Sequence, residues 1–157
     1  MINKIQIPTK RLIGIQAIGP SSFNDEAQSG AKFSEQLWRE FIGKLVESGI
    51  SLDRDMYGVS WPADELTPPQ HVYYFCGFES DQDFDGLIPL NLEGGNYFQY
   101  NCEVLAVDID QGFQDAYMSA MPASGLKGRE GQHLEIYGEE YDPDSPVAKF
   151  RILIPVE

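Results

Sequence analysis

Two segments with helical periodicity each lie between strand-like segments, and this repeated order constrains the fold of the 157-residue chain more than any other feature. Apolar residues recur at helical spacing in residues 35–48, EQLWREFIGKLVES, and in residues 109–121, IDQGFQDAYMSAM. Pro62, Pro68 and Pro69 exclude a helix between the second and third strands. Alternating, β-branched or aromatic residues mark the expected strands at 11–18, 55–61, 71–80, 95–108, 132–140 and 147–156.

The order strand–helix–strand–strand therefore occurs twice, in halves at roughly residues 1–80 and 86–157 of one domain. It predicts an α+β fold with antiparallel sheets and with helices on one face. The opposite, helix-free faces are then available to form a ligand cleft between the halves. We expect Ser34 to cap the first helix, Gly49 to end it, and Pro122 to lie beyond the second helix.

The charge balance limits the partners of the chain. Its 25 acidic and 11 basic residues give a formal net charge of −14, which repels nucleic acids and anionic membranes and attracts cations. We therefore predict no direct nucleic-acid binding. The sequence contains no apolar signal-peptide core and no apolar run long enough to span a bilayer, which predicts a cytoplasmic protein without membrane contact. Cys76 and Cys102 are expected to be buried, reduced thiols.

Motifs for metals and cofactors are weak in this sequence. DQDFDG, residues 81–86, is similar to the start of an EF-hand loop, but Leu92 stands where that loop needs a bidentate glutamate. We interpret it as a solvated acidic turn. His71 and His133 are far apart, and neither a Cys-x-x-Cys pair nor a nucleophile elbow is present. We predict no metal, no cofactor and no ordinary nucleophile–base pair.

The segment HLEIY, residues 133–137, places a carboxylate in an expected strand. Alternation puts Leu134 and Ile136 on one face and Glu135 on the other, beside Tyr137. A water-facing Glu135 would be an ordinary surface charge, as most glutamates are. A Glu135 that lines an aromatic cavity would be a buried anion that attracts a cation.

Aromatic residues offer such a cavity. Tyr57 and Trp61 share one face of their strand, and Phe150 lies on one face of the last strand. Aromatic faces together with a carboxylate are what a flat, delocalised organic cation needs for binding. The residues alone leave open whether these rings form the hydrophobic core or a ligand site.

The chain resembles the GyrI-like effector-binding domains, which form the ligand-sensing part of AraC- and MerR-type multidrug regulators. It looks most similar to the standalone, integron-cassette-associated effector-binding proteins. The resemblance covers most of the chain and is most specific in HLEIYGEEYDPDSPVAKFRILIPV, residues 133–156. LWREF, YGVSW, YFCGFES, IPLNLEGGNYFQY and MPASG add weaker support. The chain departs from the family pattern at Ala120-Met121-Pro122, where many relatives carry Trp-Leu-Pro.

The resemblance implies a tandem strand–helix–strand–strand fold with the ligand site between the two halves. It places the pocket carboxylate on Glu135 and leaves open whether Tyr73 or Tyr74 faces the site. The pocket aromatics that it implies are Tyr137, Tyr57 and Phe150, together with Trp61, which faces the same way as Tyr57.

The implied function is the binding of hydrophobic aromatic organic cations, for drug sensing or sequestration, without catalysis. The resemblance leaves two alternatives. Some relatives hydrolyse strained, cyclopropane-bearing electrophiles, for which the same glutamate and a nearby tyrosine would orient water or donate a proton. Others are gyrase inhibitors that act through a protein interface and need no pocket.

Overall fold

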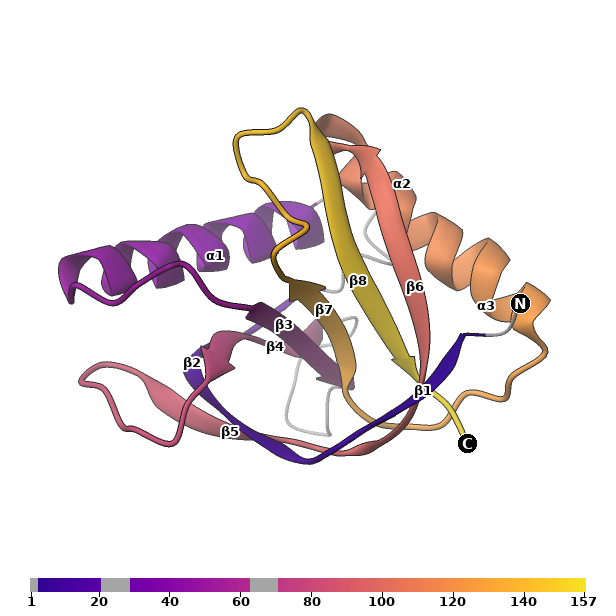
Figure 1. Cartoon of the computed structure of the whole chain (residues 1–157), viewed down its shortest axis with the longest axis horizontal. Coiled ribbons are helices and arrows are strands. Elements are labelled where there is room, and N and C mark those ends of the chain that lie inside the picture. Colours follow the sequence, from indigo (N-terminus) through magenta and orange to yellow (C-terminus); the bar gives the residue numbers. More distant parts are fainter. Residues whose placement is uncertain (1–2, 21–28, 63–70) are drawn as a thin grey trace.

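The computed structural model describes residues 3–20, 29–62 and 71–157. Within these residues, one antiparallel sheet of eight strands curls into a half-barrel in the order β1-β6-β8-β7-β3-β4-β2-β5 (Figure 1). The strands are β1 Lys4–Ile7, β2 Lys10–Pro20, β3 Met56–Pro62, β4 His71–Glu79, β5 Ile88–Leu92, β6 Gly95–Leu105, β7 His133–Tyr137 and β8 Val147–Pro155.

The two halves of the sheet have the same topology. Counted outward from the centre, the first half runs β3-β4-β2 and the second runs β7-β8-β6, and the halves meet where β3 pairs with β7. This arrangement confirms the predicted strand–helix–strand–strand order. The short strands β1 and β5 were not predicted; they extend the sheet beyond β6 and β2. β5 carries Pro89, which is tolerated because β5 is an edge strand.

Helix α1 runs from Ser29 to Glu47 and packs its apolar stripe of Leu37, Phe41 and Leu45 against β2 and β4. Gly49 ends the helical path in a left-handed conformation, with φ of 68°, as predicted. The prediction that Ser34 caps α1 was wrong, because the chain is already helical from Ser29. The Phe33 ring lies against Gly19 of β2, a tertiary contact that favours the earlier start.

The second helical region consists of several pieces: a 3₁₀ turn at Ala106–Asp108, α2 at Ile109–Gln114, a π-helical segment at Asp115–Ala120, and α3 at Met121–Ser124. Pro122 lies inside α3 rather than beyond the helix, which corrects the sequence prediction. Because proline has no N–H, it needs an interrupted hydrogen-bond ladder, and the π-helical segment just before α3 supplies that interruption.

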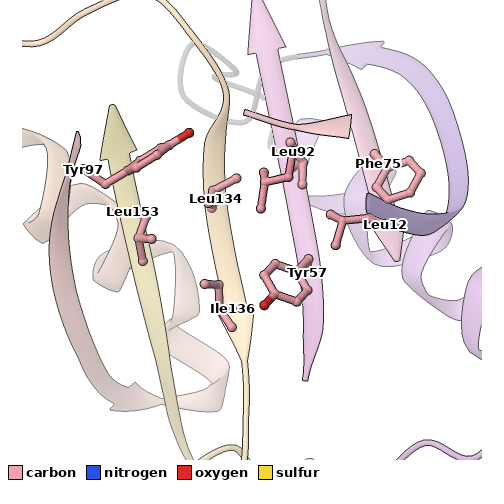
Figure 2. Close-up of a cluster of buried hydrophobic side chains, with 9 residues drawn as sticks. Leu12, Tyr57, Phe75, Leu92, Tyr97, Leu134, Ile136 and Leu153 are labelled. Atoms are coloured by element: carbon pink, nitrogen blue, oxygen red, sulfur yellow. The ribbon is translucent and has the colours of Figure 1, made fainter. Parts of the chain in front are cut away.

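Both helical regions cover the same face of the sheet (Figure 1). The opposite, concave face is filled by its own side chains, which Figure 2 shows converging from several strands. The curl of the sheet therefore buries the face that we expected to be an open cleft. This concave cluster consists of Leu12, Tyr57, Val59, Phe75, Leu92, Tyr97, Leu134, Ile136 and Leu153.

Candidate ligand-binding site

Glu135 lies at the centre of the sheet, on the face that carries the helices. Its strand β7 runs between β3 and β8, and Glu135 pairs with Gly58 on one side and with Ile152 on the other. The residue is only 9% exposed, so its carboxylate is not an ordinary surface charge. The expected alternation is confirmed, because Leu134 and Ile136 point into the concave cluster on the opposite face.

Hydrogen-bond donors from both halves of the protein surround the carboxylate. The Tyr74 hydroxyl of β4 donates to Glu135 Oε1. The Trp38 indole N–H of α1 donates to the Tyr74 hydroxyl oxygen at 2.8 Å. The Trp38 indole and the Tyr137 hydroxyl also lie within hydrogen-bonding reach of the carboxylate. The site thus straddles the seam between the halves.

Burial and hydrogen bonding act in opposite directions on the pKa of Glu135. Removal from water raises it above its ordinary value, and the hydrogen bonds from Tyr74, Trp38 and Tyr137 partly oppose this. Burial, reinforced by the charge of Glu135, raises the pKa of the Tyr74 and Tyr137 hydroxyls. Both tyrosines therefore stay protonated at neutral pH and act as donors.

Tyr117 and His133 form a second polar pair on the same face. The Tyr117 hydroxyl lies 2.8 Å from His133 Nδ1, and the two rings stack with their centroids 5.7 Å apart. Burial, and then the charge of Arg129, lowers the pKa of His133, so this imidazole is neutral at neutral pH. Burial raises the pKa of Tyr117, and Glu135 adds to the shift. Tyr117 belongs to the π-helical segment, a distortion that often marks functional sites.

Aromatic rings enclose the remaining sides. Tyr137 meets Trp38 edge to face, with centroids 5.5 Å apart, and stacks on Phe150, with centroids 5.1 Å apart. The Tyr141 ring also lies edge to face against the Tyr137 ring, with centroids 4.8 Å apart. Tyr137 therefore joins the core under α1 to the core under the second helical region.

Gly58 provides the space in which the carboxylate lies. A Cβ atom at this position would stand 2.3 Å from Glu135 Oε1 and 2.5 Å from its Cγ. The glycine is needed for this close approach and not for backbone strain, because only the glycines at positions 49, 86, 95, 125 and 131 have positive φ in the described residues. Gly58 thus sets the position of Glu135.

We expect Gly58→Ala to lower the stability by about 1–3 kcal/mol, the usual cost of overpacking a core, and to displace the carboxylate. Glu135→Ala removes the Cγ and the carboxylate that the new Cβ would meet, so the double variant should recover part of the loss. A double-mutant cycle of melting temperatures measures this coupling. Strictly additive effects of the two substitutions would contradict direct contact between these positions.

The structure brings together Glu135, Tyr137 and Phe150, three of the residues that the sequence singled out. It does not bring Tyr57 and Trp61 to them. Tyr57 pairs with Ile136, so its ring lies in the concave cluster (Figure 2). The reason is the register of β3 against β7, which sets Gly58 and not Tyr57 beside Glu135.

Trp61 faces the same way as Tyr57, as predicted, and packs against the concave cluster. It stacks on Tyr73, with ring centroids 5.3 Å apart and an angle of 9° between the planes. The question of which β4 tyrosine faces Glu135 is thereby answered, because Tyr74 does so and Tyr73 lies on the opposite face.

The sequence prediction missed Trp38, Tyr117 and Gly58 as site residues. Helical periodicity assigns Trp38 to the helix core, which is correct for its ring but overlooks its indole N–H. A buried indole needs an acceptor, and that requirement was the available signal. Tyr117 carried no such signal, because its orientation depends on the π-helical segment.

Two surface hollows of the described chain are lined by residues other than Glu135. One of about 340 Å³ is lined by Asn101, Cys102, Glu103, Glu140, Lys149, Phe150 and Arg151. Another of about 250 Å³ is lined by Lys10, Arg54, Asp55, Tyr57 and Glu79. Phe150 is the one residue that the first hollow shares with the aromatic enclosure. Glu135 lines neither of these two hollows, and its side chain is buried.

Other sequence predictions concern the cysteines, the acidic turn, metal binding and membrane spans. Cys76 and Cys102 are buried and unbridged, as predicted. Asp83 of the acidic turn forms an ion pair with Arg11. Among the described residues, no cluster of three or more His, Cys, Asp or Glu side chains is arranged to hold a metal ion, and no helix is long and apolar enough to cross a membrane. Pro68 and Pro69 lie outside the described residues.

Comparison with known proteins identifies the family. The model of the GyrI-like small molecule binding domain matches residues 1–157. The chain belongs to the GyrI-like family. Among curated proteins, this GyrI-like chain is 26% identical over 155 residues to the right origin-binding protein of Escherichia coli K12, covering 92% of the chain and 52% of that protein. It is 28% identical over 131 residues to the transcriptional regulator Rob of Salmonella typhimurium, covering 77% of the chain and 44% of that protein.

The GyrI-like chain therefore spans about half the length of these curated relatives, 52% and 44%.

Solved structures confirm the fold at low identity. SAV2435 bound to tetraphenylphosphonium matches with a TM-score of 0.75 and 13% identity, covering 100% of this chain and 94% of that one. An integron cassette protein from Vibrio cholerae matches with a TM-score of 0.66 and 13% identity, covering 99% of this chain and 95% of that one.

Proposed function

We propose that this GyrI-like protein binds hydrophobic aromatic organic cations, with Glu135 as the counter-charge inside an aromatic enclosure. The observation that carries the proposal is a buried carboxylate held by neutral donors and without a basic partner. None of the ion pairs among the described residues includes Glu135. Its hydrogen-bonding neighbours Tyr74, Trp38 and Tyr137 carry no charge.

A buried anion without a cation is costly, because a carboxylate loses its hydration and gains no ion pair in return. A ligand that brings a positive charge to this place offsets that cost. Aromatic faces around the carboxylate add cation–π attraction and apolar contact area. The formal charge of −14 raises the local concentration of cations and disfavours direct contact with nucleic acid.

The comparisons support the same class of ligand. The family is one of small-molecule binding domains, and a protein with this fold has been solved with tetraphenylphosphonium, an aromatic cation. We place Glu135, Tyr137 and Phe150 in the ligand site and add Trp38 and Tyr74. The biological role that follows is drug sensing or sequestration.

Because Glu135 is buried and closely contacted by Tyr74 and Gly58, a ligand must displace side chains to reach the carboxylate. The seam between α1 and the π-helical segment is the place where this can occur, since Trp38 of α1 lies within hydrogen-bonding reach of Glu135 and Tyr117 of the π-helical segment contacts His133 on the same strand. The backbone of β7 is fixed by pairing on both sides, so we expect the sheet to remain unchanged.

The experiment that tests the function uses the two tryptophans as reporters. We expect crystal violet, a cationic triarylmethane dye, to quench tryptophan fluorescence saturably at micromolar concentration. Trp38→Phe should abolish most of the quenching, because Trp38 contacts the site, whereas Trp61→Phe should retain it, because Trp61 lies on the opposite face. Absence of saturable binding would overturn the proposal. Chemical conversion of an electrophilic ligand, followed by chromatography, would favour the hydrolase alternative.

A further inference from the structure

The connection between β7 and β8, residues 138–146 and here called the β7–β8 loop, covers one end of the aromatic enclosure. Its residue Tyr141 lies edge to face against Tyr137, with ring centroids 4.8 Å apart. Tyr137 packs in both helix-covered clusters and lies within hydrogen-bonding reach of Glu135. A continuous series of contacts therefore leads along the seam from the half-buried Tyr141 to the buried carboxylate.

The residue next to Tyr141 fastens the β7–β8 loop to β8. Arg151 of β8 donates from Nε to Glu140 Oε1 at 3.1 Å, and we call this contact the latch. Arg151 Nη2 also lies 4.0 Å from Asp55 Oδ2, in the segment that precedes β3. Arg151 follows Phe150 in β8, so their side chains point to opposite faces of the sheet. The loop is thus held by Glu140 on one face and by Tyr141 on the other.

Gly138, at the start of the loop, gives the latch its space. A Cβ atom at this position would stand 2.8 Å from Glu140 Oε2, 2.9 Å from Arg151 Nη2 and 3.0 Å from Asp55 Oδ1. Glu140 and Arg151 also line the hollow of about 340 Å³, together with Phe150 of the aromatic enclosure. Release of the latch would therefore let the loop move next to this hollow and uncover the enclosure.

The backbone of the loop is arranged to move as a unit. Its hydrogen bonds close turns within the loop, from the Tyr141 N–H to the Gly138 carbonyl at 3.0 Å and from the Ser145 N–H to the Asp142 carbonyl at 3.1 Å. The chain returns to the sheet at Pro146, whose carbonyl accepts the Ala106 N–H at 2.8 Å. These turns can persist when the side-chain contacts to Arg151 and Tyr137 are released.

We propose that Arg151 is a positioning residue that, through Glu140, holds Tyr141 over the Glu135 site, and that the β7–β8 loop opens to admit a cation and closes over it. This inference rests on the proposed function and specifies how the ligand reaches that site. A loop that closes in the same way over the free and the occupied site slows entry and release alike. It therefore sets the rates of exchange and leaves the affinity nearly unchanged.

Stopped-flow fluorescence with crystal violet measures both rates through tryptophan quenching. Glu140→Ala removes the latch. It should raise the association and dissociation rate constants together by about two- to fivefold, the range that corresponds to a partly exposed ion pair, and keep Kd within about twofold. Glu103→Ala is the matched control, because it removes the same charge from an ion pair with Lys149 in the same hollow but outside the loop. It should leave the dissociation rate constant unchanged.

Gly138→Ala disturbs the latch without removing a charge. The new Cβ displaces the ends of Glu140 and Arg151, so both rate constants should rise as they do in Glu140→Ala. Gly43→Ala is its control, because a Cβ atom at this position of α1 meets no atom within 4 Å. Thermal melts of the variants establish that each is folded at the temperature of the kinetic measurement.

Tyr141→Ala tests whether the latch acts through this ring. The substitution removes the cover itself, so adding Glu140→Ala should change the rates no further. A cycle of the two single variants and the double variant should then be strongly non-additive in both rate constants. A latch that only stabilises the fold would act independently of Tyr141.

The outcomes separate the two proposals. A parallel rise of both rate constants in the latch variants, absent from the controls and lost in the Tyr141→Ala background, supports the inference. Unchanged rates in Glu140→Ala and Gly138→Ala, a change in only one rate constant, or a latch effect that survives in Tyr141→Ala overturns it and leaves cation binding intact. Absence of saturable crystal violet binding by the wild type overturns the proposed function and this inference with it.

Discussion

Glu135→Gln is expected to lower the affinity for tetraphenylphosphonium by one or two powers of ten, about 1.4 kcal/mol each, while the melting temperature holds or rises. Glutamine keeps the shape and the hydrogen-bonding capacity of the side chain and removes its charge. A ligand cation then loses its counter-charge. The free protein loses only a buried anion without a cationic partner, which is a cost and not a source of stability.

The dependence of this stability difference on pH follows from the raised pKa of Glu135. A carboxyl whose pKa is higher in the folded state binds its proton more tightly there than in the unfolded chain. It therefore stabilises the fold at low pH, and this contribution is lost as the pH rises through the folded-state pKa. The amide of a glutamine side chain does not titrate, so the stability advantage of Glu135→Gln should grow as the pH rises through that range.

Glu139→Gln is the matched control, because it removes the same charge from an exposed position just beyond β7. Calorimetric titration and thermal melts of the wild type and of both variants complete the measurement. Glu139→Gln should change affinity and stability by no more than about 0.5 kcal/mol, as is usual for surface substitutions. If both variants changed cation affinity equally, Glu135 would act only as one of the many acidic charges of the protein and not as the specific counter-charge of the ligand.

Local patterns predicted most of the fold. Alternation in HLEIY correctly separated Glu135 and Tyr137 from Leu134 and Ile136, because side chains of a strand alternate whatever its neighbours are. Helical periodicity likewise placed Phe41 and Leu45 in the core beneath α1. These inferences depend only on the chain itself and its local geometry.

Two features depended on relations between distant segments and were not predictable in this way. A shift of one residue in the pairing of β3 with β7 would exchange Gly58 for Tyr57 beside Glu135, and nothing in either strand alone fixes that register. The second feature is the curl of the sheet. It turns the face expected to form an open cleft into a core in which Phe75 and Tyr97 are fully buried.

The family resemblance pointed to Glu135 as a site residue, and the structure gives a physical reason for this choice. Glu135 was singled out because the motif around it was specific, and its burial on the seam explains why a carboxylate in this strand is unusual. The same resemblance could not assign Trp38, since a tryptophan within a helical stripe is equally compatible with a core. Its second role depends on the contact between its N–H and Tyr74.

Phe75→Ala is expected to lower the free energy of unfolding by about 3–5 kcal/mol, the usual cost of removing a phenyl ring from a packed core. Phe75 has no exposed surface and lies in the concave cluster, one residue from Tyr74 but on the opposite face of β4. The substitution should therefore leave a cavity on the face that does not carry Glu135. Denaturant titration measures the stability loss, and calorimetry below the melting temperature measures cation binding.

Tyr74→Phe is the matched variant on the other face of β4. It removes one hydroxyl and almost no volume, so its effect on stability should be smaller than that of Phe75→Ala, while its effect on cation binding should be larger, because Tyr74 donates directly to Glu135. The folded fraction of Phe75→Ala should bind tetraphenylphosphonium within about twofold of the wild type, well below the tenfold that corresponds to 1.4 kcal/mol. If Phe75→Ala instead abolished binding in protein that is still folded, the ligand would have to occupy the concave face. Tyr57 and Trp61, which lie there, would then replace Glu135 as the centre of the site.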